Sequence, residues 1–499
     1  MHILRCTRVA FLALLAPLSA TSRAHTLVGG PFLTDLTPTE VTVSWETKYL
    51  SSGRVDVRFP GGTRTFRSDG ERRTMHHVRL TELPPDTECR YTVHLDGEAL
   101  REYPFRTAPL LSRTFRFAAY GDSQERHGGR HGKVADAILT HRPNFVLHSG
   151  DYTMRATRSD WASEFFRPAS NLLASVPIVA APGNREAGSL AFRDYFVAPS
   201  SPTWRSWRYA SLEAFVLDTN EDLLLDSPQH TWLGQALAAS KAHWKVVVFH
   251  HPLYSSSRHG SDETLRCALM PLFLEHGVDL VMVGHDQCYE RTLPIGTGEQ
   301  PERNALFHVV SGGGGGSIYN VYPKIWTAKS RSSHHYCIVD VTDSKLTITA
   351  YNLDGDAFDT ATLTKSGNKP RCTDAMAAEA VNFFDSAQQF NRLYLPAVGA
   401  DHANCVRLRF ENPYARDLKG SIAWKLPNKG WSIQPSACDV TVPAGGKAQA
   451  VFTVTFDPTV AGPDAHQSPE VLLTAGTRTV AVPAFTRTLR QFASPLLTR

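Results

Sequence analysis

Five apolar, strand-like segments of this chain run into residues that can bind a metal ion, and this recurrence constrains the fold more than any other feature. The segments lead into Gly121-Asp122, Gly150-Asp151, Gly183-Asn184, His250-His251-Pro252 and Gly284-His285. Glycine permits a sharp turn at the end of a strand, and open α/β sheets bind ligands at the carboxyl ends of their strands. We therefore expect five polar side chains to meet at one edge of a sheet: Asp122, Asp151, Asn184, His250 and His285.

Each of these short sequences has an ordinary explanation when it is taken alone. Gly-Asp and Gly-Asn are common turn sequences, and an aspartate at such a position often caps a helix. Five of them at successive strand ends are not expected from turn chemistry. Because carboxylate, amide and imidazole groups together suit Mn, Fe or Zn, the pattern indicates a metal site.

The region that carries these motifs, residues 113–365, alternates strand-like and helical stretches, as an α/β sheet does. Helices are expected over 133–140, 160–174, 229–240 and 263–276. His251 follows His250 in an extended segment, where successive side chains alternate. We expect His251 to point away from the site and to support or pack against it.

The flanking segments have β patterning, so the 499 residues are expected to form three domains. Residues 26–110 alternate apolar and polar side chains, with a core Trp45, a Leu83-Pro84 corner and Tyr91 on the next strand. That order resembles a fibronectin type III domain. Residues 371–499 are mostly β after an expected helix over 375–389, and they resemble an immunoglobulin-like sandwich.

Residues 1–24 have the features of a secretory signal peptide. Arg5 and Arg8 precede a short apolar run, and Ser22-Arg23-Ala24 offers a cleavage site. A membrane anchor is the alternative, but the ten apolar residues are shorter than the roughly 20 that span a bilayer. We expect a secreted or periplasmic protein with no integral membrane segment after cleavage.

The net charge and the cysteines limit the partners and the cellular compartment that we expect. The net charge is +4 at pH 7, and the leader carries three of the arginines. A near-neutral mature chain predicts no nucleic-acid partner, whereas the oligomeric state stays open. Export would permit disulfides, and Cys405 with Cys438 is a plausible pair, although the sequence does not define the connectivity.

The order of the five motifs resembles the metallophosphoesterase (calcineurin-like) superfamily, and within it the purple acid phosphatase branch. The resemblance covers about residues 113–365. It implies a multidomain chain: an α/β metallophosphoesterase four-layer sandwich, flanked by N-terminal fibronectin type III-like and C-terminal immunoglobulin-like β-sandwiches. The domains would be a signal peptide at 1–24, a purple acid phosphatase N-terminal-like domain at 26–110, a catalytic domain at 113–365 and a β-sandwich at 371–499.

The resemblance also implies two neighbouring metal ions, divalent or mixed-valence Fe, Mn or Zn. Asp151 would bridge them, and Asn184, His250 and His285 would complete the second site. The first site would retain Asp122 but lacks the family's usual histidine and tyrosine, because this chain has Gln287 and Met154 there. We expect one strong and one weak site, with possible weak or substitute ligands at Gln124, Gln287, His127 and His131.

The family's Gly-Asn-His-Glu motif is Gly-Asn-Arg-Glu here, with Arg185 at the histidine position. Arginine keeps its proton and cannot be a general acid. It can hold phosphate oxygens through two parallel hydrogen bonds. We therefore expect Arg185 and Asp151 to be the catalytic residues, with Arg185 on the substrate phosphate.

The function implied is an exported metal-dependent phosphoric ester hydrolase with a degenerate first metal site. It would act on small phosphate mono- or diesters by metal-activated hydroxide. The alternative is a catalytically inactive binding protein with the same fold. The substitutions around the first metal favour the alternative, whereas the complete second set favours the hydrolase.

Overall fold

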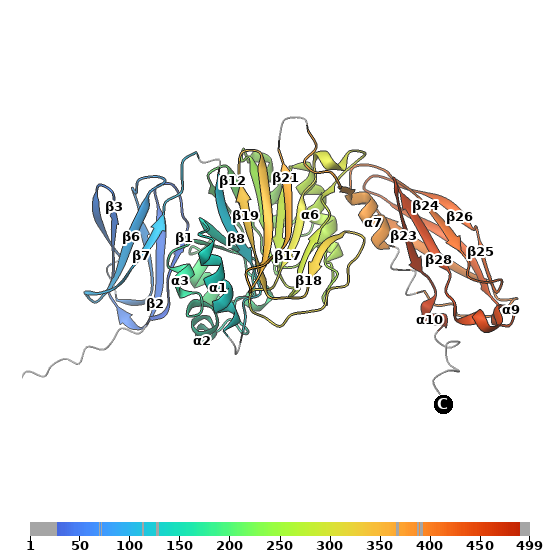
Figure 1. Ribbon diagram of the computed structural model, residues 1–499, viewed down its shortest axis with the longest axis horizontal. Helices are drawn as coiled ribbons and strands as arrows, with labels where there is room; N and C mark the ends of the chain where they lie inside the picture. Colours follow the sequence, from blue (N-terminus) through green and yellow to red (C-terminus); the bar gives the residue numbers. More distant parts are fainter. Residues whose placement is uncertain are drawn as a thin grey trace, which may run out of the picture.

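The computed structural model describes residues 27–68, 70, 72–111, 114–125, 129–365, 369–386, 389 and 393–489. The expected signal peptide and His127 lie outside these residues. Three bodies follow one another along the longest axis, an N-terminal β body, a central α/β body and a C-terminal β body (Figure 1). Among the described segments, no helix has the length and apolar character to cross a membrane.

The N-terminal body consists of two antiparallel sheets. One has the order β1-β2-β5 and the other β4-β3-β6-β7. Alternate residues of β6 are buried, as the period-two pattern predicts, and Trp45 and Tyr91 lie in the core. The likeness to a fibronectin type III domain stays a prediction. The strands are β1 Leu27–Thr34, β2 Val41–Ser51, β3 Gly53–Phe59, β4 Gly62–Arg67, β5 Arg73–Leu80, β6 Glu88–Leu95 and β7 Glu98–Arg106.

The central body contains two sheets whose inner faces pack together. The first sheet, β10-β9-β8-β19-β20-β21, comprises β8 Phe115–Tyr120, β9 Phe145–His148, β10 Ile178–Ala180, β19 His335–Val341, β20 Lys345–Asn352 and β21 Ala357–Thr364. The second, β11-β12-β13-β14-β17-β15-β18, comprises β11 Arg205–Tyr209, β12 Leu212–Val216, β13 Trp244–Val248, β14 Leu280–Val283, β15 Tyr289–Thr292, β17 Phe307–Ser311 and β18 Thr327–Arg331. Side chains of both sheets, such as Phe117 and Val246, share one core.

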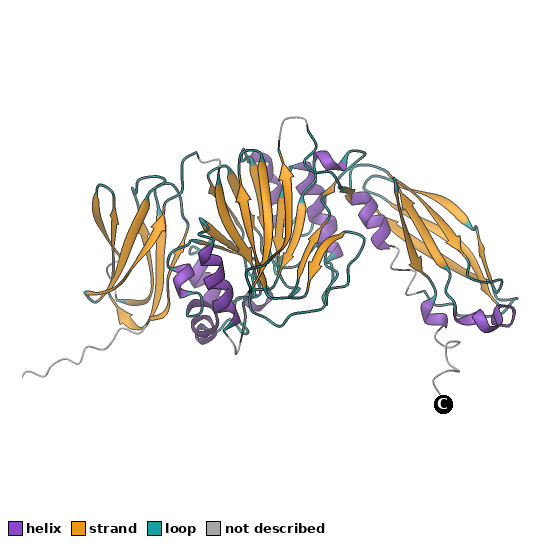
Figure 2. Cartoon of the chain, in the orientation of Figure 1, coloured by secondary structure: helices purple, strands orange, loops and turns teal. Residues whose placement is uncertain are grey.

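Helices cover the outer faces of these two sheets (Figure 2). On the first sheet lie α1 (Arg130–Thr140), α3 (Ser170–Leu173) and α4 (Leu190–Phe196), and on the second lie α5 (Pro228–Ala239) and α6 (Glu263–Glu275). Strand alternation explains the layers, because Val246 and Val248 face the core between the sheets whereas Val247 faces the α5 and α6 side. The order of layers is helix, sheet, sheet, helix.

The single helix expected over 160–174 is three pieces. These are α2 (Arg158–Asp160), a π-helical turn over Trp161–Phe166, and α3. Pro168 removes a backbone donor between the last two. The wide turn brings Phe166 against Phe32 of β1, with ring centroids 5.0 Å apart, and the Tyr91 hydroxyl donates to the Ala174 carbonyl at 2.8 Å. The N-terminal body is thus bonded to the central one.

The C-terminal body begins with α7 (Ala378–Ser386), inside the helix expected over 375–389. Its sheets have the orders β23-β27-β25 and β26-β24-β28-β29. Cys405 on β23 and Cys438 on β26 lie in different sheets and are both free thiols, so the expected Cys405–Cys438 pair is wrong. The immunoglobulin-like identity stays a prediction. The strands are β23 Asn404–Glu411, β24 Leu418–Lys425, β25 Trp431–Gln434, β26 Ala437–Val442, β27 Lys447–Phe456, β28 Glu470–Ala475 and β29 Arg478–Pro483.

Short elements complete the chain. β16 (Ile295–Gly296) pairs in parallel with β22 (Met376–Ala377) and joins the central body to α7. α9 (Pro458–Ala461) and α10 (Thr486–Leu489) lie along the lower edge of the C-terminal body (Figure 1). A buried ion pair, Arg266 to Asp385 at 2.7 Å, links α6 to α7. The C-terminal body is therefore also bonded to the central one.

Candidate metal centre

The five predicted residues meet at one edge, where β8, β9, β10, β13 and β14 end. Asp122, Asp151 and His285 adopt left-handed backbone angles, with φ of 57°, 58° and 69°. Such angles are uncommon for residues with a side chain and cluster at functional sites. The chain turns sharply after each strand and directs these side chains back toward the sheet edge.

Glycine before the polar residue leaves room for a carboxylate. A Cβ at Gly284 would lie 2.4 Å from Asp122 Oδ2, and one at Gly183 would lie 2.3 Å from Asp151 Oδ1. Real Cβ atoms do not come this close to an oxygen. Gly183 and Gly284 are therefore required by the close approach of a carboxylate, since neither of them adopts a positive φ.

Asn184, His250 and His285 direct their ligand atoms at one another. His250 Nε2 and His285 Nδ1 each lie 2.9 Å from Asn184 Oδ1, and the two nitrogens are 3.2 Å apart. His250 Nε2 also lies 3.4 Å from Asp151 Oδ1. Burial, and then the neighbouring histidines, lower the pKa of His250 well below 6.5 and that of His285 to about 2.

The proton positions make this cluster suitable for a cation. His250 Nδ1 donates to the Ser149 carbonyl at 2.9 Å. In a neutral imidazole the other nitrogen, Nε2, then carries a lone pair. That lone pair faces two oxygen atoms that also accept hydrogen bonds, Asn184 Oδ1 and Asp151 Oδ1. An ion that accepts lone pairs from all of them resolves the contact, so the residues fit a metal ion.

Asp122 is fully buried and only partly satisfied. Its Oδ2 accepts the backbone N–H of His285 at 2.8 Å, whereas Oδ1 has no hydrogen-bond partner in the described part of the chain. Burial, and then the charge of Asp151, raise the pKa of Asp122 well above its usual value. Ligand atoms of Asp122, Asp151 and His250 lie within 4.8 Å of one another.

Arg185 binds the protein at the place where we expected it to face substrate. Its backbone N–H and its Nε donate to the two oxygens of Asp151, each at 3.0 Å, and its Nη1 donates to the Met154 carbonyl at 3.0 Å. The side chain is 27% exposed. Burial raises the pKa of Asp151, and the hydrogen bonds and charge of Arg185 oppose that rise.

The expected substitute ligands lie in different environments. Gln124 is buried beside Asp122, and neither atom of its amide has a partner within the described ranges. The Gln287 amide packs against Gly316, where a Cβ would lie 2.7 Å from its oxygen. His131 is not available, because its nitrogens contact the Tyr120 hydroxyl at 3.1 Å and the Glu164 carbonyl at 2.9 Å.

Glu186 ties the ligand loops together, a role that we did not assign from the sequence. Its carboxylate accepts three backbone N–H groups, from Asp151 at 2.8 Å, Tyr152 at 3.1 Å and Gly183 at 3.1 Å. Burial, and then Asp151, raise the pKa of Glu186 to about 8. The sequence feature that could have revealed this role is the position of Glu186 two residues after Asn184, in the Gly-Asn-Arg-Glu motif.

His251 lies closer to the site than the expected alternation allows. A ligand atom of its ring lies within 4.8 Å of those of His250 and His285, and its Nδ1 contacts the Thr219 hydroxyl at 2.6 Å. The expectation that it points away fails because β13 ends at Val248. The alternation of an extended strand therefore stops before His251.

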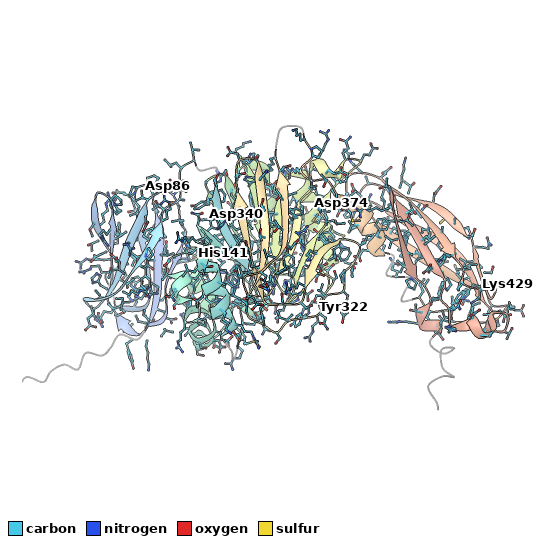
Figure 3. The ribbon with its side chains drawn as sticks, in the orientation of Figure 1. Asp86, His141, Tyr322, Asp340, Asp374 and Lys429 are labelled. Atoms are coloured by element: carbon cyan, nitrogen blue, oxygen red, sulfur yellow. The ribbon has the colours of Figure 1, made fainter. Side chains whose placement is uncertain are left out.

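The open side of the centre is lined by a loop that sequence reasoning missed. His259 lies against His285, with ring centroids 4.2 Å apart, and the Arg258 guanidinium lies 5.1 Å from the Tyr319 ring. A cavity of about 390 Å³ opens here, lined in part by His251, His259 and His285. Tyr322, further along the Tyr319 loop, lies at the surface of the central body (Figure 3).

The central part of the chain is similar to known phosphoesterases. The family model for calcineurin-like phosphoesterases matches residues 115–289. Phosphoenolpyruvate phosphatase of Allium cepa is 26% identical over 54% of this chain and 62% of its own length. Purple acid phosphatase 21 of Arabidopsis thaliana is 26% identical over 48% of this chain and 58% of its own length. The chain thus spans about 60% of the length of these curated relatives.

A solved structure shares the fold. The purple acid phosphatase PPD1 from yellow lupin (Lupinus luteus) seeds superposes with a TM-score of 0.60 and 20% identity. The match covers 68% of this chain and 75% of that protein. At this identity the likeness concerns the arrangement of helices and strands.

Proposed function

Because this chain carries a calcineurin-like phosphoesterase domain of the purple acid phosphatase-like branch, we propose that it is a metal-dependent phosphoric ester hydrolase. Its substrates are small phosphate mono- or diesters. Asp151, Asn184, His250 and His285 hold one metal ion strongly, and Asp122 helps to form the weaker first position. The observation that carries the proposal is the lone-pair contact of His250 Nε2 with Asn184 Oδ1 at 2.9 Å.

The metal, of the Mn, Fe or Zn class, supplies Lewis-acid polarisation of a phosphoryl oxygen when it is bound. The protein side chains bind and orient the substrate. Of the contacts that the structure describes for the Arg185 side chain, none involves Nη2. We assign Nη2 to a substrate phosphate oxygen. His259, exposed at the cavity mouth, is placed to give a proton to the leaving oxygen.

The expected cellular location and the flanking domains are part of the same proposal. Residues 1–24 act as a signal peptide, and the mature protein is secreted or periplasmic. Residues 26–110 and 371–499 are fibronectin type III-like and immunoglobulin-like modules. N-terminal sequencing of the exported protein tests the first point, because a chain that retains Met1 contradicts it.

A binding protein without turnover is the second candidate. The observation that favours it is Arg185, which stands at the position of the family's catalytic histidine and contacts the carboxylate of Asp151. Such a protein binds metal and phosphorylated ligands but releases no phosphate. The two candidates therefore differ in a single measurable property.

The test is hydrolysis of a chromogenic phosphate monoester and diester by the mature protein, with Mn, Fe, Zn or Mg. His250→Ala is compared with His243→Ala, an exposed histidine of the same domain. We expect activity that His250→Ala loses and His243→Ala keeps. Metal binding without hydrolysis in the wild type supports the binding protein, and equal activity in both variants contradicts the assigned site.

A further inference from the structure

The two buried carboxylates of the centre are balanced unequally by positive charge. Asp122 and Asp151 are 0% and 3% exposed, and their oxygens lie within one ligand cluster. Asp151 forms an ion pair with Arg185 at 3.0 Å. For Asp122 the described part of the chain provides no ion pair, and its carboxylate accepts a hydrogen bond from the backbone N–H of His285.

The donors at the first metal position do not fit a metal ion well. Met154 occupies the position at which the family resemblance implies a tyrosine ligand, and Gln124 and Gln287 offer only neutral amides. Hard cations and first-row metals bind such amides more weakly than carboxylate, phenolate or imidazole. His131 is engaged by Tyr120 and Glu164 and cannot replace them.

Arg185 contacts two residues that stand at sequence positions of the implied first-metal ligands, Asp151 and Met154. Its Nε binds Asp151 Oδ2, and its Nη1 binds the backbone carbonyl of Met154. Its backbone N–H holds the other oxygen of Asp151. A guanidinium stays charged and forms directed hydrogen bonds with a carboxylate, so a positive charge is fixed beside the carboxylate of Asp151 that a cation at the first position would share.

We infer that the Arg185 guanidinium takes the place of the first metal ion, so that the working centre holds one metal ion and one arginine. The inference rests on the metal site of the proposed function and explains why the first position is weak. A cation placed against Asp122 and Asp151 would meet a fixed positive charge at short range. None of the described contacts of Arg185 involves Nη2, so this nitrogen can meet a phosphate oxygen.

The test is Mn²⁺ titration of metal-free full-length protein, with bound metal counted by elemental analysis. The wild type takes up one Mn²⁺ per chain. Arg185→Gln takes up two, because Asp122 and Asp151 then lack the competing charge, and the added ion binds at least about tenfold more tightly than any second ion of the wild type. Arg258→Gln, which removes the arginine that lies against the Tyr319 ring, stays at one.

Further variants separate the possible results. Arg185→Met is a second neutral variant in case Arg185→Gln folds poorly, and Arg185→Lys, which retains the charge, stays at one ion. Asp122→Asn abolishes only the ion gained by Arg185→Gln. Two equally tight ions in the wild type, or one unchanged ion in both neutral variants, overturn the inference. A wild type that binds no Mn²⁺ overturns the proposed metal site as well.

Discussion

Gly284→Ala should damage the centre through a single methyl group. The added Cβ would lie 2.4 Å from Asp122 Oδ2 and 2.9 Å from Ser149 Oγ. Ordinary contacts are about 3.4 Å or longer, so Asp122 must move by about 1 Å. Overpacking of this kind costs about 1–3 kcal/mol of stability, and a displacement of about 1 Å at a reacting centre costs about 100-fold in rate.

The movement also reaches the metal ligands, because Asp122 Oδ2 accepts the backbone N–H of His285. We expect Gly284→Ala to lose phosphoesterase activity about 100-fold and to bind Mn²⁺ more weakly. The assays are initial rates with a chromogenic phosphate ester, Mn²⁺ titration, and urea unfolding of the same samples.

Gly234→Ala is the matched control. Gly234 lies inside α5, and its added Cβ would meet only Leu272 Cδ1 at an ordinary 3.6 Å. Alanine is favoured over glycine in a helix by about 1 kcal/mol, so this variant should keep full activity and gain stability. Wild-type activity and metal affinity in Gly284→Ala would refute the packing account of the centre.

Three further predictions concern stability. Burial lowers the pKa of His131 from 6.5 to about 4, so between these two pH values only the unfolded chain takes up the proton. The free energy of unfolding should therefore fall by up to about 3 kcal/mol as the pH drops from 6.5 to about 4. The fall should be smaller in His131→Gln. Parallel urea profiles against pH would contradict this. Tyr91→Phe removes the hydroxyl that donates to the Ala174 carbonyl and should lower the free energy of unfolding by about 1–3 kcal/mol. An unchanged urea unfolding midpoint would show that this hydrogen bond does not hold the two domains together. Arg266→Met removes the 2.7 Å ion-pair partner of the buried Asp385 and should lower the free energy of unfolding by about 3 kcal/mol. This value is the low end for a broken buried pair, because Lys324 lies 3.8 Å from Asp385. A loss under about 1 kcal/mol would mean that the pair contributes little.

The converging ligands could be predicted because their positions follow from the backbone alone. An apolar run, a glycine and a polar residue define a strand end, and parallel strands bring their carboxyl ends together. Asn184, His250 and His285 therefore lie where the sequence pattern predicts, within 3.2 Å of one another.

The differences arise where packing or loops decide the structure. The π-helical turn over Trp161–Phe166 follows aromatic contacts with Phe32 of another domain, which no local pattern reveals. His259 and Tyr319 come from loops without periodicity. We expected Arg185 to face substrate because its positive charge suits a phosphate group. Its partner in the structure is Asp151, and this contact depends on where the Asp151 side chain points.

The central claim is a single metal ion held beside Arg185, and anomalous diffraction from crystals soaked in Mn²⁺ tests it most directly. The account predicts one strong peak in contact with Asn184 Oδ1, His250 Nε2 and His285 Nδ1, with the Arg185 guanidinium still on Asp151. Two peaks of equal height, with the second against Asp122 and Arg185 displaced, would contradict the arginine-for-metal assignment. No peak at the two histidines would contradict the metal centre itself.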